Sequence, residues 1–107
     1  ATAQDGLVVS QVDGIDRDGL RDLAVAISTQ DGVNAVVLGT APEGGGAALV
    51  AVVAPQSGLD AGVLVAEAAK TIGGGGRPNA EMTVIGGRNP ENLPQALEQA
   101  RAAAQAS

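Results

Sequence analysis

The chain has 107 residues and a formal net charge of −6 at pH 7, and it contains no histidine, cysteine or aromatic residue. This length fits a single domain, and the missing residue types exclude disulfides, thiolate or imidazole metal ligands, and serine–histidine or cysteine–histidine nucleophile pairs. The acidic balance argues against a generic nucleic-acid-binding protein, which usually carries a basic face.

The first predicted elements are a strand and a helix. Residues 7–12 (LVVSQV) are rich in β-branched side chains and have turn residues on both sides, which predicts a strand. Asp16 is a good N-cap for the helix that follows, and we expect this helix to stop at Gly32. Its apolar stripe, with the i, i+3, i+4, i+7 spacing of one helix face, consists of Leu20, Leu23, Ala24 and Ile27.

Two predicted strands follow, joined by a glycine-rich turn. Residues 34–40 (NAVVLGT) and 47–54 (AALVAVVA) flank the turn APEGGG, and this spacing predicts an antiparallel hairpin. The second of these strands is apolar throughout, so we expect it to lie in the centre of the sheet with both faces covered. It is far too short to cross a bilayer, and no membrane is expected among the partners.

A second helix and a fourth strand are predicted next. After a turn at residues 55–58, Asp60 is expected to cap a helix that continues through Ile72. Lys70 lies in the last turn of that helix, where the helix dipole favours a cation. Residues 82–85 (MTVI) predict the fourth strand.

The last predicted element is a helix over residues 93–104. A turn at residues 86–90 precedes it, and we expect Asn92 to cap it together with Gln95. The complete order, βαββαβα, predicts an α/β fold in which three helices pack on a mixed β-sheet of about four strands, in a single domain covering residues 1–107. Because the chain begins with alanine rather than methionine, we expect it to be a piece of a longer polypeptide.

The segment TIGGGGRPNAEMTVIGG, residues 71–87, contains six glycines. It follows a helix, whereas the dinucleotide fingerprint opens one, and Arg77-Pro78 stands where a Walker A loop needs lysine and serine or threonine. Two interpretations remain. In one, the glycines let the backbone pass tightly over the sheet or present N–H groups to an anion, with Arg77 and Arg88 as cationic partners. In the other, the run is a helix C-cap and packing loop with exposed arginines.

This segment is also the one locally basic part of an acidic chain. Between residues 70 and 90 the charged side chains are Lys70, Arg77, Arg88 and a single acidic residue, Glu81. We expect the glycine run to be required for the fold, with Gly74 or Gly75 as the positions where a side chain strains the backbone. The acidic residues near the first helix lack the glycine and distal glutamate of an EF-hand, so we interpret them as caps and a solvated face.

The motif GGGGRP, followed by IGGRNPENLPQALEQAR, resembles the C-terminal, DHHA1-type domain of alanine–tRNA ligase (alanyl-tRNA synthetase). The same domain type is found in phosphoesterases of the DHH family. The likeness covers nearly the whole chain: LVVSQVDGIDRDGLRDLAVAI resembles the first strand and helix, NAVVLGTAPEGGGAALVAVVAP the hairpin, and DAGVLVAEAAKTIGGGGRP the second helix and glycine motif. The phosphoesterases typically have a histidine where this chain has Arg77, which argues against that branch.

The resemblance implies a parent enzyme that joins alanine to its tRNA with ATP and magnesium and hydrolyses mischarged tRNA in a separate zinc-dependent editing domain. This domain is expected to hold no cofactor and no catalytic residue. It would contact tRNA(Ala) at the outer corner and couple charging with editing, in the cytoplasm, with the rest of the synthetase and, in some members, a second copy as partners. A dimerisation or protein-interaction module and the substrate-binding half of a phosphoesterase are the alternatives.

The residues expected to contact tRNA come from the glycine motif and from the local charge. The resemblance carries over to Gly73, Gly74, Gly75, Gly76, Arg77 and Pro78, with Gly86 and Gly87 as further candidates, and the charge pattern adds Lys70 and Arg88. Since no aromatic side chain can stack on a base, binding would rest on phosphate and shape. We therefore expect weak tRNA affinity for the isolated domain.

Overall fold

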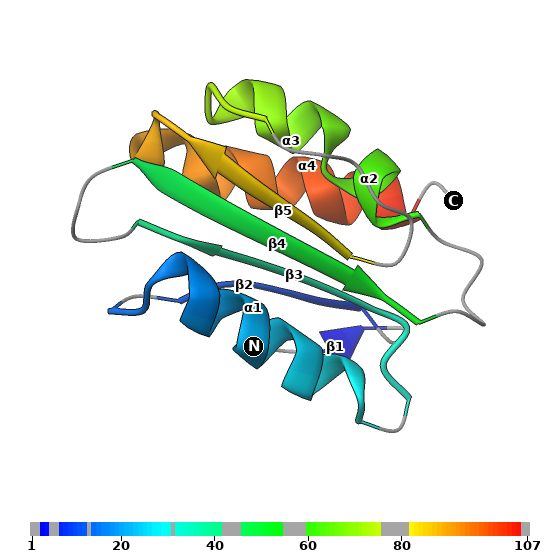
Figure 1. Cartoon of the computed structure of the whole chain (residues 1–107). Helices are drawn as coiled ribbons and strands as arrows, with labels where there is room; N and C mark the ends of the chain where they lie inside the picture. The colour runs from blue at the N-terminus through cyan, green and yellow to red at the C-terminus, as the bar shows by residue number, and fades with distance from the viewer. Residues whose placement is uncertain are drawn as a thin grey trace.

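In the residues that the computed structural model describes, five strands form one mixed sheet with helices on both faces (Figure 1). The described residues are 3–4, 7–12, 14–30, 32–41, 46–54, 60–75 and 82–105. The strands lie in the sheet in chain order: β1 (Ala3–Gln4), β2 (Leu7–Gln11), β3 (Ala35–Thr40), β4 (Ala47–Val53) and β5 (Met82–Gly87). Strands β2 and β3 are parallel, and every other neighbouring pair is antiparallel.

The helices divide unequally between the two faces of the sheet (Figure 1). Helix α1 (Arg17–Ser28) covers one face and forms the crossover that the parallel pair β2–β3 requires. The opposite face is covered by α2, α3 and α4. Their bounds, with the 3₁₀ turn η2, are α2 (Ala61–Leu64), α3 (Ala66–Thr71), η2 (Pro90–Asn92) and α4 (Leu93–Gln105).

Strand β4 lies in the centre of the core, as predicted. All seven of its residues are buried. Leu49 and Ala51 pack with α2, α3 and α4, whereas Val50 and Val52 pack with α1. Alternate side chains of a strand point to opposite faces, so an uninterrupted apolar run fills two cores at once.

The α/β fold and the four predicted strands are confirmed. The structure adds β1, whose two residues carry no apolar pattern and form a strand because they pair with β2. The predicted helix from Asp60 to Ile72 is interrupted at Val65, whose backbone (φ −109°, ψ 8°) separates α2 from α3. Gly62 and the β-branched residues Val63 and Val65 all have low helix propensity, which explains why the helix breaks here.

Three predicted boundaries were wrong. Helix α1 ends earlier than Gly32, because Thr29 caps it and the Thr29 hydroxyl donates to a carbonyl of the last turn at 2.8 Å. Residues 86–87, predicted to be in a turn, belong to β5 because they pair with β4. Asn92 lies in η2 and does not cap α4; its Nδ2 donates to the Thr71 carbonyl oxygen at 3.0 Å.

Both predicted aspartate N-caps are confirmed. Asp16 Oδ1 accepts a hydrogen bond from the Gly19 N–H at 2.7 Å, and Asp60 Oδ1 accepts one from the Val63 N–H at 3.2 Å. The predicted turn at residues 55–58 lies outside the described residues. Among the helices described, none is long and apolar enough to cross a membrane.

Candidate functional site

Helix α3 ends in a Schellman motif at Gly73. Gly73 has a φ of 68°, in the left-handed region that favours glycine. Its N–H donates to the Lys70 carbonyl at 3.1 Å, and the Gly74 N–H donates to the Ala69 carbonyl at 2.9 Å. These two hydrogen bonds satisfy carbonyls of the last helical turn, so the first glycine of the run is the helix stop.

The second glycine is needed because two stretches of backbone approach closely. A Cβ atom at Gly74 would overlap the carbonyl oxygen of Gly86, and a Cβ atom at Gly87 would lie 2.5 Å from the carbonyl oxygen of Ile72. Gly75 forms an isolated β-bridge with Gly86, with its N–H donating to the Gly86 carbonyl at 3.1 Å. The two glycine motifs of the sequence therefore pack directly against each other.

These hydrogen bonds test the two interpretations of the glycine run. The N–H groups of Gly73, Gly74 and Gly75 all donate to backbone carbonyls, so none of the three is directed at an anion. Close passage of the backbone and the helix C-cap are both observed. For the described glycines, the anion-nest interpretation was wrong, because each donor already has a partner within the fold. Gly76, Arg77 and Pro78 lie outside the described residues.

The loop after β5 closes the end of α3. The N–H groups of Arg88 and Asn89 both donate to the Ile72 carbonyl oxygen, at 2.7 and 2.9 Å, and Asn92 caps the neighbouring Thr71 carbonyl. Ile72 itself is fully buried. A Cβ atom at Gly73 would lie 4.0 Å from Cβ of Arg88. The fold therefore holds the exposed Arg88 beside the glycine motif.

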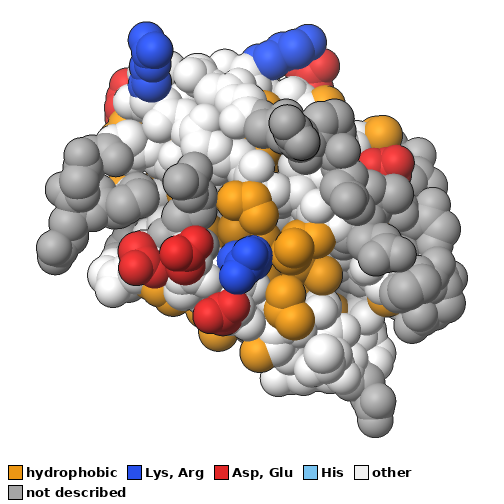
Figure 2. Space-filling view, viewed as in Figure 1, with side chains coloured by type: hydrophobic (Ala, Val, Ile, Leu, Met, Phe, Trp, Pro, Cys, Tyr) orange, Lys and Arg blue, Asp and Glu red, His pale blue; other side chains and the backbone are white. Residues whose placement is uncertain are grey.

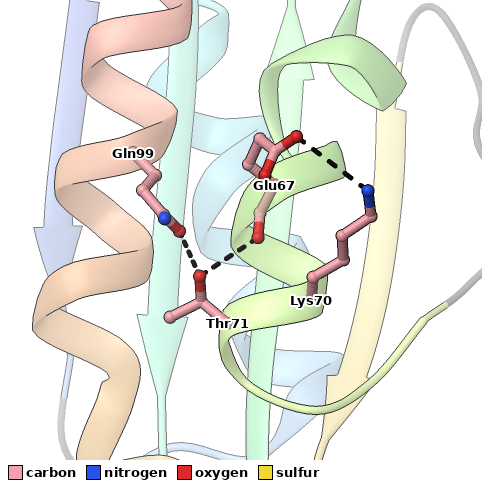
Figure 3. A network of polar contacts seen from close by, with 4 residues as sticks. All are labelled: Glu67, Lys70, Thr71 and Gln99. Carbon is pink, nitrogen blue, oxygen red and sulfur yellow. Dashed lines mark hydrogen bonds and ion pairs between the residues drawn. The ribbon is translucent and has the colours of Figure 1, made fainter.

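Lys70 lies on the exposed side of α3 (Figure 3). Its Nζ is 4.0 Å from Oε1 of Glu67, and both side chains are more than 70% exposed. Such a surface ion pair contributes little and leaves the ammonium group hydrated. The Thr71 hydroxyl lies within hydrogen-bond distance of the Glu67 carbonyl oxygen, at 3.2 Å, and of Oε1 of Gln99. The contact with Gln99 joins α3 to α4.

The cations of the described residues differ in their neighbours. Arg21, Lys70 and Arg101 each lie 3.7–4.0 Å from an acidic side chain, whereas Arg88 pairs with none of the acidic residues that are described. Figure 2 shows basic and acidic side chains next to one another over the described part of one face, rather than a basic stripe. Nor do the described residues contain a group of three acidic side chains close enough to hold a metal ion.

The structure brings five of the predicted site residues together at one corner, where α3 ends beside the end of β5. They are Lys70, Gly73, Gly74, Gly75 and Arg88. Sequence reasoning missed Asn89 and gave Asn92 a different role, as the cap of the last helix; both donate to carbonyls at the end of α3 and hold this corner. Their partners are distant in sequence, so no local pattern could identify them.

The DHHA1 domain model matches residues 4–106. The chain belongs to the DHHA1 family. Two relatives of this DHHA1 domain are an alanine–tRNA ligase of Chlorobium chlorochromatii, 51% identical over 47 residues, and the chloroplastic/mitochondrial alanine–tRNA ligase of Sorghum bicolor, 55% identical over 42 residues. These segments cover 44% and 39% of the chain but only 5% and 4% of the two ligases.

A solved structure has the same fold as this DHHA1 domain. The C-Ala domain of the Aquifex aeolicus alanyl-tRNA synthetase superposes with a TM-score of 0.79 and 21% sequence identity, covering 91% of this chain and 88% of that one. At this identity the superposition shows the fold alone. The expected DHHA1 membership and the likeness to alanine–tRNA ligases are confirmed.

Proposed function

We propose that this DHHA1 domain is a non-catalytic, tRNA-binding part of an alanine–tRNA ligase, which contacts the outer corner of the tRNA and couples charging with editing. The relatives and the shared fold support the parent enzyme. One observation supports the contact: Arg88 is exposed, has no acidic partner in the described residues, and is fixed at its backbone N–H by the Ile72 carbonyl.

Arginine suits a phosphate contact because its planar guanidinium group can donate two hydrogen bonds at once. Lys70 adds a second positive charge at the same corner, as a hydrated point charge. The chain as a whole carries a net negative charge that repels RNA at long range, and it has no aromatic side chain for base stacking. In this proposal the rest of the ligase supplies the affinity by holding the domain near the bound tRNA.

The proposal assigns ATP, magnesium and zinc to other parts of the parent enzyme. It also expects the parent enzyme to act in the cytoplasm. The partners of the domain are then tRNA(Ala) and the remaining domains of the ligase. Homodimer formation belongs to the second candidate function, a protein-interaction module. The observation that favours it is Val63 on α2, an aliphatic side chain that is 62% exposed and lines a mostly apolar hollow beside β5.

The test is a tRNA titration of the full-length ligase at several salt concentrations. Arg88→Glu, alone and combined with Arg77→Glu, is compared with Arg21→Glu on α1, which makes the same charge change on the opposite face of the sheet. We expect Arg88→Glu to weaken binding about tenfold, the usual effect of losing a charge-assisted hydrogen bond. The slope of log affinity against log salt should flatten by about 0.7–0.9 for each phosphate that the variant no longer neutralises.

The control separates a specific contact from a general effect of charge. Arg21→Glu should leave the salt slope unchanged. If it weakens binding as much as Arg88→Glu, or if neither variant changes affinity, the α3–β5 corner is an ordinary solvated surface and the protein-interaction module becomes the better proposal.

A further inference from the structure

A hollow of about 350 Å³ lies between α2, α3 and β5. The helices contribute Gly62 from α2 and Ala66 and Ala69 from α3, all of which line the hollow. Thr83 and Ile85 of β5 form the opposite wall. Gly62, Ala66 and Ala69 have small side chains or none, which leaves this space open. Its volume falls at the lower end of the range for ligand sites.

Most of the surface lining this hollow is apolar. Val63 belongs to the lining and is 62% exposed, more than any other large hydrophobic residue described. Ile85 is buried at the sheet, and the walls otherwise consist of small side chains. Water gains few hydrogen bonds in such a space, so displacing it with an aliphatic group is favourable.

Asp60 is the one charged residue among the described residues of the lining. Its Oδ1 accepts the capping hydrogen bond from the Val63 N–H, and no cation of the described part of the chain lies within ion-pair distance of it. The carboxylate repels phosphate and attracts a cation, so RNA is a poor occupant. A ligand that matches both features combines an aliphatic group with an adjacent positive charge.

We propose that this hollow binds a segment of a partner protein that carries an aliphatic side chain next to a lysine. The aliphatic side chain would lie between α2–α3 and β5, in contact with Val63 and Ile85. The lysine ammonium group would pair with Asp60 at the rim, where an acidic chain of net charge −6 adds to the attraction. This site adjoins the Arg88 corner at Gly75, which lines the hollow, but its proposed ligand differs and does not depend on tRNA contact.

The test uses three capped dipeptides as probes: acetyl-Leu-Lys-amide, acetyl-Leu-Glu-amide and acetyl-Gly-Lys-amide. Each is titrated into the ¹⁵N-labelled chain while amide shifts are followed. Acetyl-Leu-Lys-amide should shift the amides of Val63, Ala66 and Ile85 and saturate at millimolar concentration, as expected for a ligand of this size. Acetyl-Leu-Glu-amide should bind about fivefold more weakly, and acetyl-Gly-Lys-amide should not saturate. The amide of Val25, on the other face of the sheet, should not move.

Two variants separate the charge from the cavity. Asp60→Asn keeps a good N-cap, so α2 should stay intact while the preference for the lysine probe over the glutamate probe disappears. Ala66→Leu places a larger side chain from an exposed position into the hollow and should abolish the shifts. An unchanged far-ultraviolet circular dichroism spectrum for both variants shows that they remain folded.

Four outcomes would overturn the proposal. The first is equal affinity of the lysine and glutamate probes for the unmodified chain, and the second is no saturable shift with any probe. The third is persistence of the same shifts in Ala66→Leu. The fourth is a dimer, seen by sedimentation, that Ala66→Leu dissociates, because a second copy of the chain would then occupy the hollow.

Discussion

Three consecutive glycines, Gly73, Gly74 and Gly75, occupy very different environments. Gly73 has a left-handed backbone, Gly74 lies against the backbone of Gly86, and Gly75 has neither constraint, since a Cβ atom there would meet nothing within 4 Å. The sequence predicted strain at Gly74 or Gly75. The structure places the left-handed residue at Gly73 instead, where a Cβ atom would also meet the Asn89 side chain at 2.7 Å, and of these three glycines only Gly74 would clash with backbone.

Alanine substitutions along the run should therefore have unequal effects on stability. Gly74→Ala should lower the free energy of unfolding by about 2–3 kcal/mol, because the backbone carbonyl of Gly86 must move. Gly73→Ala should cost about 1–2 kcal/mol through its left-handed backbone. Gly75→Ala should stay within about 0.5 kcal/mol of the unmodified chain. Urea unfolding with a common m-value measures all three, and equal losses for Gly74→Ala and Gly75→Ala would contradict the close-approach argument.

At the scale of the elements, strands were easier to predict than the ends of helices. The apolar runs that became β3 and β4 are bounded by turn residues, so local pattern alone identified them. The interruption at Val65 was missed, although Gly62, Val63 and Val65 disfavour a helix, because such residues also occur inside unbroken helices. Residues 86–87 were missed because their strand conformation depends on pairing with β4, a partner distant in sequence. Asn92 illustrates this point: its sequence context is that of an N-cap, but its amide reaches a carbonyl of another helix.

The observed role of Asn92 and the capping role predicted from sequence have different mutational effects. Because Asn92 closes α3, Asn92→Ala should lower the free energy of unfolding by about 1 kcal/mol through loss of the hydrogen bond to Thr71. Gln95→Ala should change stability by less than about 0.5 kcal/mol, because Gln95 is exposed on α4. A capping box would instead make both substitutions costly. Thermal or urea unfolding of the two variants distinguishes these cases.

At the scale of the whole molecule, the corner that carries Arg88 and the hollow beside Asp60 differ in the ligand they favour. The corner offers a cation, whereas the hollow offers apolar walls and a carboxylate. The glycine motif accounts for their proximity, because Gly75 lines the hollow while Gly73 lies beside Arg88. The sequence predicted the corner from its charge and glycines, but not the hollow, since small residues also occur in ordinary packed helices.

The proposed role in the ligase predicts which step the domain serves. Deleting it from the full-length enzyme should raise the KM for tRNA in alanine charging, because the domain's expected contacts are with tRNA. Alanine-dependent ATP–pyrophosphate exchange involves no tRNA and should keep its rate. The proposal assigns both reactions to other domains of the ligase, so the isolated chain should show neither charging nor deacylation. A parallel loss of exchange and charging on deletion would mean that the domain supports the fold of the parent rather than its hold on tRNA.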